Sequence, residues 1–160
     1  MYKFLLKIYI GLKQWFKNAF LTSYKSAPRE LILYVTSTCN QKCSHCFYSA
    51  ELNQPNDLSF ADYELISKNC NDIEAILIGG GEPFIRKDLP EIINIFYKNN
   101  NTLRFGIPTN CTLYPRMFDS IKKLIKLCPN AKFGINVSLD GLEETHNKIR
   151  RYPNAFNKSI

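Results

Sequence analysis

The chain has 160 residues, of which 45% are hydrophobic, 13% aromatic and 22% charged, a composition typical of one globular domain and unlike that of a disordered chain. No apolar run approaches the ~20 residues that a membrane-spanning helix requires, so an integral membrane protein is not expected. The net charge of +7 is concentrated in residues 1–29, which hold six basic and no acidic side chains, whereas residues 30–160 hold 15 basic and 14 acidic ones; this balance argues against nucleic acid as a partner of the domain.

Residues 1–20 are predicted to form a basic amphipathic helix. At about 100° per residue, Phe4, Ile8 and Leu12 fall on one side, and lysines such as Lys7 and Lys17 fall on the other. Such a helix suits peripheral contact with an anionic membrane surface, and it suits packing against the domain or a partner equally well. We therefore expect two parts, namely a helix and linker in residues 1–29 and a folded domain in residues 30–160.

From residue 31 onward, short β-rich apolar runs alternate with helical stretches. The predicted strands are residues 31–36, 75–78, 103–107 and 133–139. The predicted helices are residues 60–69, 89–98 and 115–127, and residues 154–160 begin one more. Ser59 before Asp62 and Asp88 before Glu91 are capping signals for the first two helices. This order, with later strands about 30 residues apart, predicts the α/β fold class with a parallel sheet that is open or curved into part of a barrel.

Each predicted strand is followed by a polar or glycine-rich segment. In parallel α/β folds, ligands bind at the carboxyl ends of the strands, so the four segments are expected to face one cavity. In chain order they are Cys39-Asn-Gln-Lys-Cys43-Ser-His-Cys46, Gly79-Gly80-Gly81-Glu82-Pro83, Pro108-Thr109-Asn110-Cys111 and Ser138-Leu139-Asp140-Gly141.

The compact spacing of Cys39, Cys43 and Cys46 predicts a metal centre. Thiolates are the usual protein ligands of iron–sulfur clusters, and three thiolates on a four-iron cluster leave one iron open for a further ligand. A structural zinc site made by these thiolates with His45 stays open as an alternative, although His45 directly precedes Cys46 and the two side chains would struggle to reach one ion. Clustered cysteines also favour a reducing compartment, which predicts a cytoplasmic location.

The glycine run and the remaining polar residues predict a small cofactor. The run lacks the Gly-Lys-Ser/Thr of a phosphate-binding loop and the G-x-G-x-x-G of a dinucleotide site, which favours a cofactor with an amino acid head group. Glu82 is suited to meet a positively charged group. The other candidates offer hydroxyl, amide and carboxylate groups that suit a ribose diol or a carboxylate, and each is also an ordinary turn residue: Thr109, Asn110, Ser138 and Asp140.

With these motifs in view, the chain resembles the radical S-adenosylmethionine (radical SAM) superfamily. The spacing C-x-x-x-C-x-x-C is the hallmark of that family, and His45 stands where an aromatic residue is common. Gly80-Gly81-Glu82 resembles its Gly-Gly-Glu motif, and Thr109-Asn110-Cys111 resembles Thr-Asn-Gly with cysteine in place of glycine. The segment from Ser138 to Gly141, with His146 and Arg150 after it, resembles the branch containing peptide maturases and molybdenum-cofactor-type enzymes, although Arg151 stands where glycine is usual.

The resemblance implies a [4Fe–4S] cluster on Cys39, Cys43 and Cys46 and an S-adenosylmethionine cofactor. One electron, from a flavodoxin- or ferredoxin-like donor, would cleave that cofactor to a 5′-deoxyadenosyl radical, which abstracts hydrogen from a peptide or small-molecule substrate. The residues implied to hold the cofactor are His45, Gly80, Gly81, Glu82, Thr109, Asn110, Ser138 and Asp140.

The family core resembles a six-strand partial barrel, and the sequence supplies about four βα units, matching the N-terminal half of that core. We therefore expect either an enzyme fragment or a chain whose barrel a partner completes. The alternative function is a non-catalytic metal-binding or interaction module, with residues 1–20 directing it to a membrane or a partner. Cys70, Cys111 and Cys128 are expected to be small buried side chains.

Overall fold

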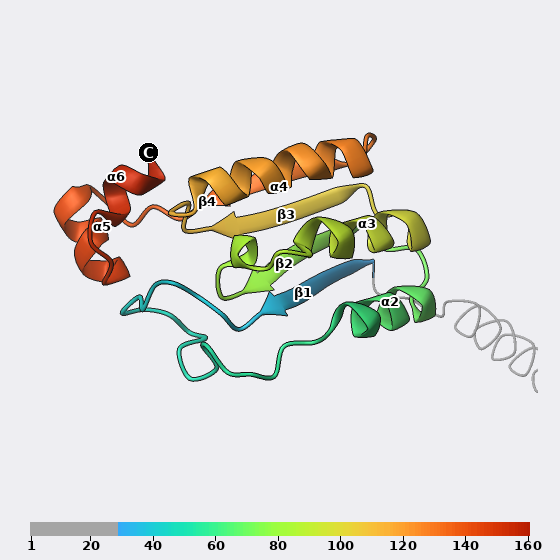
Figure 1. The fold of residues 1–160 in the computed structure, drawn as a ribbon, viewed down its shortest axis with the longest axis horizontal. Coiled ribbons are helices and arrows are strands. Elements are labelled where there is room, and N and C mark those ends of the chain that lie inside the picture. Colours follow the sequence, from blue (N-terminus) through green and yellow to red (C-terminus); the bar gives the residue numbers. More distant parts are fainter. Residues whose placement is uncertain (1–28) are drawn as a thin grey trace, which may run out of the picture.

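The computed structural model describes residues 29–160, which form one sheet of four parallel strands in the order β1-β2-β3-β4 (Figure 1). The strands are β1 Glu30–Thr36, β2 Ala75–Gly80, β3 Arg104–Thr109 and β4 Lys132–Val137. The helices are α2 Phe60–Asn69, the short 3₁₀ helix η1 Pro83–Ile85, α3 Leu89–Asn99, α4 Tyr114–Leu127, α5 Glu143–Arg150 and α6 Ala155–Ser159. The predicted α/β class with parallel strands is confirmed, whereas the helix predicted for residues 1–20 lies outside the described residues.

Helices α2, α3 and α4 cover one face of the sheet. Alternate strand residues such as Val35, Ile78 and Ile107 point toward these helices and are fully buried, as are Ile92 and Phe96 of α3. On the opposite face, Ile32 is 59% exposed and Leu77 is 43% exposed. Because side chains alternate along a strand, this pattern places the core between the sheet and the three helices.

All four strands point toward the same end of the domain, where α5 and α6 lie together with the long segment between β1 and α2 (Figure 1). This segment, residues 37–59, carries the three clustered cysteines, and we refer to it as the cysteine loop. The domain therefore collects at one end the ends of the strands, the cysteine loop and the two last helices. Within residues 29–160, every helix is too short or too polar to cross a bilayer.

The bounds of the predicted strands and helices lie within two residues of the observed ones. Strand β2 extends to Gly80 because Gly79 and Gly80 still pair with Tyr34 and Thr36 of β1, with an irregularity between these two β1 residues. Helix α5 was not predicted. Asp88 is the N-cap residue of α3, as predicted, but its side chain makes no cap hydrogen bond and accepts from Arg86 instead. The predicted Ser59–Asp62 capping box of α2 is confirmed.

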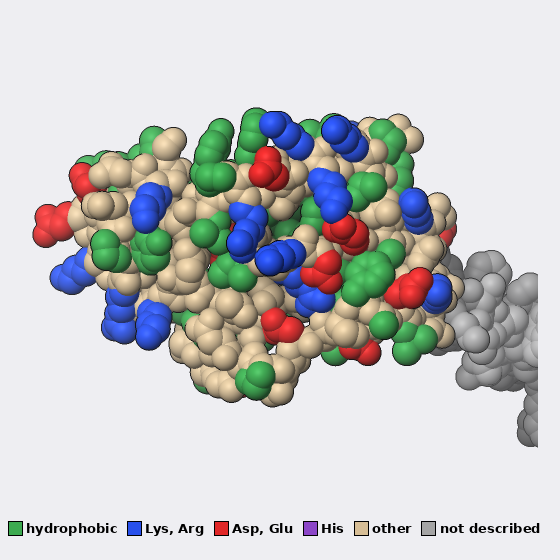
Figure 2. All heavy atoms as spheres, viewed as in Figure 1, with side chains coloured by type: hydrophobic (Ala, Val, Ile, Leu, Met, Phe, Trp, Pro, Cys, Tyr) green, Lys and Arg blue, Asp and Glu red, His purple; other side chains and the backbone are tan. Residues whose placement is uncertain are grey.

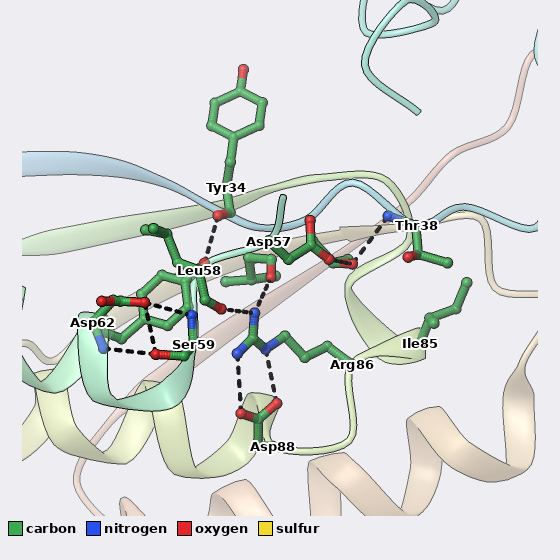
Figure 3. Close-up of polar contacts among 12 residues, drawn as sticks. Tyr34, Thr38, Asp57, Leu58, Ser59, Asp62, Ile85, Arg86 and Asp88 are labelled. Atoms are coloured by element: carbon green, nitrogen blue, oxygen red, sulfur yellow. Dashed lines mark hydrogen bonds and ion pairs between the residues drawn. The ribbon is translucent and has the colours of Figure 1, made fainter. Parts of the chain in front are cut away.

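Arg86 fastens the two ends of the cysteine loop (Figure 3). Its Nη1 atom donates to the carbonyl oxygens of Val35 at 2.7 Å and Leu58 at 2.8 Å, and Asp88 receives the other side of the guanidinium at 2.8 and 3.1 Å. Asp57 adds a second tie, accepting from Thr36 Oγ1 and from the amide of Ser37, both at 2.6 Å. The loop thus starts and ends at fixed points, although it contains no regular secondary structure.

The surface that carries the helices has mixed charge. Figure 2 shows acidic side chains lying among basic ones on this face rather than a stripe of one sign. One such pair joins α4 to α3, between Lys123 and Glu91. Exposed pairs of this kind contribute little to stability, about 0–1 kcal/mol each.

Candidate cofactor site

One cavity of about 510 Å³ opens where the strands end. Its lining brings together residues from the cysteine loop and from the ends of β2, β3 and β4. Ten of the eleven predicted site residues line it, namely Cys39, Cys43, His45, Cys46, Gly80, Gly81, Glu82, Thr109, Asn110 and Ser138. Asp140 is the exception, since its carboxylate lies against Arg150, which does line the cavity.

The structure divides the six cysteines into two sets. Cys39, Cys43 and Cys46 are partly exposed and line the cavity, whereas Cys70, Cys111 and Cys128 do not line it. All six are free thiols. Burial raises the pKa of the Cys39 thiol, and the backbone amide of Gln41, which donates to its sulfur at 3.4 Å, opposes that rise. Cys111 and Cys128 are buried, as predicted, and Cys70 is partly buried.

Gly80 and Gly81 are required by the close approach of the end of β1 and the start of the cysteine loop. The amide of Gly81 donates to the carbonyl oxygen of Thr36 at 2.7 Å, and the amide of Glu82 donates to that of Thr38 at 2.9 Å. A Cβ atom on Gly80 would lie 2.2 Å from the Thr36 oxygen, and one on Gly81 would lie 2.2 Å from the Thr38 oxygen. Gly80 also has a φ of +111°, which residues with side chains rarely adopt.

Glu82 ties the end of β2 to the end of β3. It is 1% exposed, and its carboxylate accepts from Thr109 Oγ1 at 2.8 Å, from the amide of Asn110 at 2.7 Å and from the amide of Phe84 at 3.3 Å. Burial raises the pKa of this carboxyl group, and the three hydrogen bonds and the charge of Arg150 only partly offset that effect. Both carboxylate oxygens are therefore occupied by protein donors.

Glu82→Gln is expected to change how stability depends on pH. The pKa of Glu82 in the folded protein lies above its ordinary value of 4.5, so the folded state binds this proton more tightly than the unfolded state. Its contribution to the free energy of unfolding is therefore complete below pH 4.5 and is lost as the pH rises through the raised pKa. Urea unfolding of both proteins across this range should show the wild-type value minus the variant value falling with pH. A difference that rises with pH would contradict this assignment.

Asn110 is held by a small network of side chains. Its Nδ2 atom donates to Asn40 Oδ1 at 2.8 Å, and its Oδ1 atom accepts from Thr112 Oγ1 at 2.6 Å. Asn40 Nδ2 closes the network by donating to Thr112 Oγ1 at 2.8 Å. The side chain of Asn110 thus joins the cysteine loop to the segment that follows β3.

Asp140 and His146 form a second buried group beside the cavity. The backbone amide of Asp140 donates to Nδ1 of His146 at 3.2 Å, and the imidazole is fully buried. Burial lowers the pKa of His146, and the charge of Arg150 lowers it further while Asp140 opposes both effects. His45 is more exposed, with Nε2 3.9 Å from Asp140 Oδ1. Ser138 borders the cavity, and its amide donates to the carbonyl oxygen of Thr109 at 2.9 Å.

Cys111 occupies a backbone position that favours glycine. Its φ is +58°, in the left-handed region, and its thiol is buried 3.9 Å from the sulfur of Met117. The family motif that the sequence resembles has glycine here, and this conformation is the physical reason.

Cys111→Gly is expected to leave stability within about 1 kcal/mol of the wild type, because relief of the left-handed strain offsets the loss of a small buried contact. Cys111→Val is expected to lose about 2 kcal/mol, since a β-branched residue fits this conformation poorly. Thermal unfolding of both variants tests the comparison. Equal stabilities would show that the backbone at residue 111 is unstrained.

The residues around the cavity suit an iron–sulfur cluster. Three thiols, a backbone amide directed at one sulfur and the guanidinium of Arg150 directed at another form a donor set of the kind that holds such clusters. Gln41 adds a buried Nε2 atom that has no hydrogen-bond partner. No three His, Cys, Asp or Glu side chains among residues 29–160 are grouped to hold a metal ion. A four-iron cluster takes one thiolate per iron, so its ligands need not converge on one point.

Sequence reasoning assigned no role to Gln41 or Arg150. Gln41 is 2% exposed, yet nothing in a polar residue between two cysteines signals burial. Arg150 had a usable signal. Residues 143–150 begin with Glu143 and Glu144 and end with Lys148 and Arg150, which is the charge order of a helix. In the structure this helix is α5, and Arg150 at its end lines the cavity.

Fold and site together define an α/β protein with parallel strands that end around one thiol-lined cavity. The family model described as the Radical SAM superfamily matches residues 33–160. The chain therefore belongs to the radical SAM superfamily, and the predicted membership is confirmed.

Relatives of the chain carry names for more than one activity. The Fe-coproporphyrin III synthase of Methanosarcina barkeri is 35% identical over 129 residues, which are 79% of this chain and 31% of that protein. A probable GTP 3′,8-cyclase of Methanococcus vannielii is 32% identical over 141 residues, 82% of this chain and 45% of that protein. The chain thus spans less than half the length of these relatives.

Solved structures share the fold. That of histidine-tagged anSMEcpe with bound AdoMet superposes with a TM-score of 0.61 at 23% identity, covering 82% of this chain and 38% of that one. That of Streptococcus suis SuiB bound to S-adenosylmethionine gives a TM-score of 0.57 at 24% identity, covering 82% of this chain and 30% of that one. At these identities the likeness concerns the fold alone.

Proposed function

We propose that the chain binds a [4Fe–4S] cluster through Cys39, Cys43 and Cys46 and binds S-adenosylmethionine in the same cavity. The observation that carries this proposal is that these three thiols, and not the other three, line the cavity at the strand ends of a radical SAM domain. Held by these three thiolates, the cluster would supply the one electron, received from an external donor, that reductive cleavage of the carbon–sulfur bond of S-adenosylmethionine requires.

The chain's own residues position these groups. Gly80 and Gly81 allow the end of β1 and the start of the cysteine loop to lie directly against the end of β2. Glu82 fixes the end of β2 to the end of β3, and Asn110 fixes the end of β3 to the cysteine loop. The polar atoms of both side chains are occupied by contacts within the protein, which leaves Ser138 and His45 to contact the cofactor. Tyr34 and Phe47 add two exposed aromatic side chains to the lining of the cavity.

Anaerobic reconstitution of the chain with iron and sulfide tests the proposal. We expect a brown protein with broad absorption at about 400 nm, typical of an iron–sulfur cluster, that forms 5′-deoxyadenosine when S-adenosylmethionine and a reductant are added. A colourless protein with one tightly bound zinc would instead support a non-catalytic metal-binding module. A cluster that forms without releasing 5′-deoxyadenosine would indicate that the remaining length found in the relatives is needed for turnover.

The partners belong to the same proposal. We infer a flavodoxin- or ferredoxin-like electron donor, a peptide or small-molecule substrate, and a partner chain or further sequence that completes the barrel. The exposed sheet face at Ile32 and Leu77 supports the last of these, because an apolar sheet face is normally covered. A cytoplasmic location suits six free thiols.

A further inference from the structure

Arg150 is a buried cation held in one orientation. It is 9% exposed and lies at the last residue of α5. Its guanidinium donates one hydrogen bond to Asp140, from Nη2 to Oδ1 at 3.1 Å, and forms an ion pair with the same carboxylate, with Nε 2.5 Å from Oδ2. Because the guanidinium is planar and two of its nitrogens lie against one carboxylate, its direction is more restricted than that of a lysine ammonium group.

The nitrogen that Asp140 does not hold faces a cluster ligand. Arg150 Nη1 donates to the sulfur of Cys43 at 3.7 Å. The same helix end fixes the adjacent backbone, because the amide of Ser44 donates to the carbonyl oxygen of Ile149 at 2.8 Å. In the described part of the chain, one other side chain is within hydrogen-bonding distance of this sulfur, namely Gln41, with Oε1 at 3.6 Å. A thiolate at Cys43 would attract the guanidinium and repel that oxygen, so Arg150 is the partner suited to the ligating form.

Asp140 is itself fixed by a hydrogen bond to His146. Its amide hydrogen bond to the buried ring of His146 fixes the residue that grips Arg150. A series of contacts therefore runs from the buried part of the α5 segment to the cavity wall. Its members, in order, are His146, Asp140, Arg150 and Cys43. A three-thiolate site needs none of these contacts, so Arg150 has a role beyond forming the site.

We propose that Arg150 is a positioning residue that orients the Cys43 sulfur and raises the reduction potential of the cluster. The inference rests on the proposed function. Reduction adds one electron to the cluster, and a fixed positive charge that donates to a ligand sulfur stabilises the reduced form more than the oxidised form. Outer partners of metal ligands commonly tune a site in this way.

The test is a redox titration of the reconstituted 160-residue chain, followed by electron paramagnetic resonance of the reduced cluster. At the potential that half-reduces the wild type, Arg150→Met is expected to lower the ratio of reduced to oxidised cluster about tenfold, which corresponds to about 59 mV for a one-electron couple. The matched control is Arg151→Met, which removes the same charge from the next, exposed side chain and is expected to change the ratio less than about twofold. Arg150→Lys, which keeps the charge without the fork, should lie between them.

The outcomes are separable. Equal midpoint potentials in Arg150→Met and Arg151→Met would overturn the assignment, as would weaker S-adenosylmethionine binding with an unchanged potential, which would make Arg150 a ligand of that cofactor instead. If Arg150→Met does not fold, the potential of Arg150→Lys decides in the same way. A wild-type chain that takes up no four-iron cluster would be seen in its iron content and absorption before any titration, and it would overturn the proposed function and this inference together.

Discussion

Cys43→Ala is expected to abolish cluster assembly, whereas Cys128→Ala is expected to leave it intact. Cys43 lines the cavity together with Cys39 and Cys46, so its loss would leave a four-iron cluster with two protein ligands. Iron bound after anaerobic reconstitution should fall from about four atoms per chain to less than about one. The absorption at about 400 nm should fall in parallel.

Cys128 is a matched control because it is a buried cysteine without access to the cavity. It ends α4 with 1% exposure, and burial raises the pKa of its thiol to about 11. Cys128→Ala is therefore expected to lose about 1 kcal/mol of stability by removal of a small buried group, and no iron. Retention of iron by Cys43→Ala, or loss of iron on Cys128→Ala, would contradict the ligand assignment.

Gly81→Ala is expected to separate the cysteine loop from the end of β2. The new Cβ atom would lie 2.2 Å from the carbonyl oxygen of Thr38 and 2.5 Å from its carbonyl carbon, and backbone atoms cannot rotate away as a side chain can. The shift would also break the hydrogen bonds of the Gly81 and Glu82 amides. We expect a loss of about 3 kcal/mol, equivalent to roughly 6–12 °C in the midpoint of thermal unfolding.

Gly79→Ala provides the comparison two residues away. A Cβ atom there would meet the ring of Tyr34 at 3.6 Å, which is ordinary van der Waals contact. Its midpoint should stay within about 4 °C of the wild type, as for a loss of at most ~1 kcal/mol. Similar losses in both variants would show that the glycine run tolerates side chains equally and that the loop is not held against Gly81.

The location of the site could be predicted from the sequence because it depends on order along the chain. Alternating strands and helices imply parallel strands, and parallel strands bring their carboxyl ends to one edge. The cysteines, Gly80-Gly81, Thr109 and Ser138 each follow such a strand, and they line one cavity in the structure. This argument requires no knowledge of which side chain contacts which.

The partners of individual side chains could not be predicted, because they depend on contacts between distant residues. Glu82 was expected to meet a cofactor, yet its carboxylate accepts from Asn110, 28 residues away. Asn110 in turn contacts Asn40, 70 residues away. Polar residues beside a ligand and polar residues that lock two loops together are of the same types in a sequence, and only their burial distinguishes them.

The contact between α5 and the cysteine loop has a consequence for the order of folding. The hydrogen bond from Arg150 to Cys43 joins residues 107 positions apart, and that from Ser44 to Ile149 is of similar span. Contacts of such long range form late, because the intervening chain must first be ordered. During synthesis, the cysteines leave the ribosome long before α5, so we expect the loop to stay open to iron delivery until α5 emerges. Pulse-labelling hydrogen exchange during refolding should show protection of the Ser44 amide arriving together with that of α5 and after that of β1 and β2.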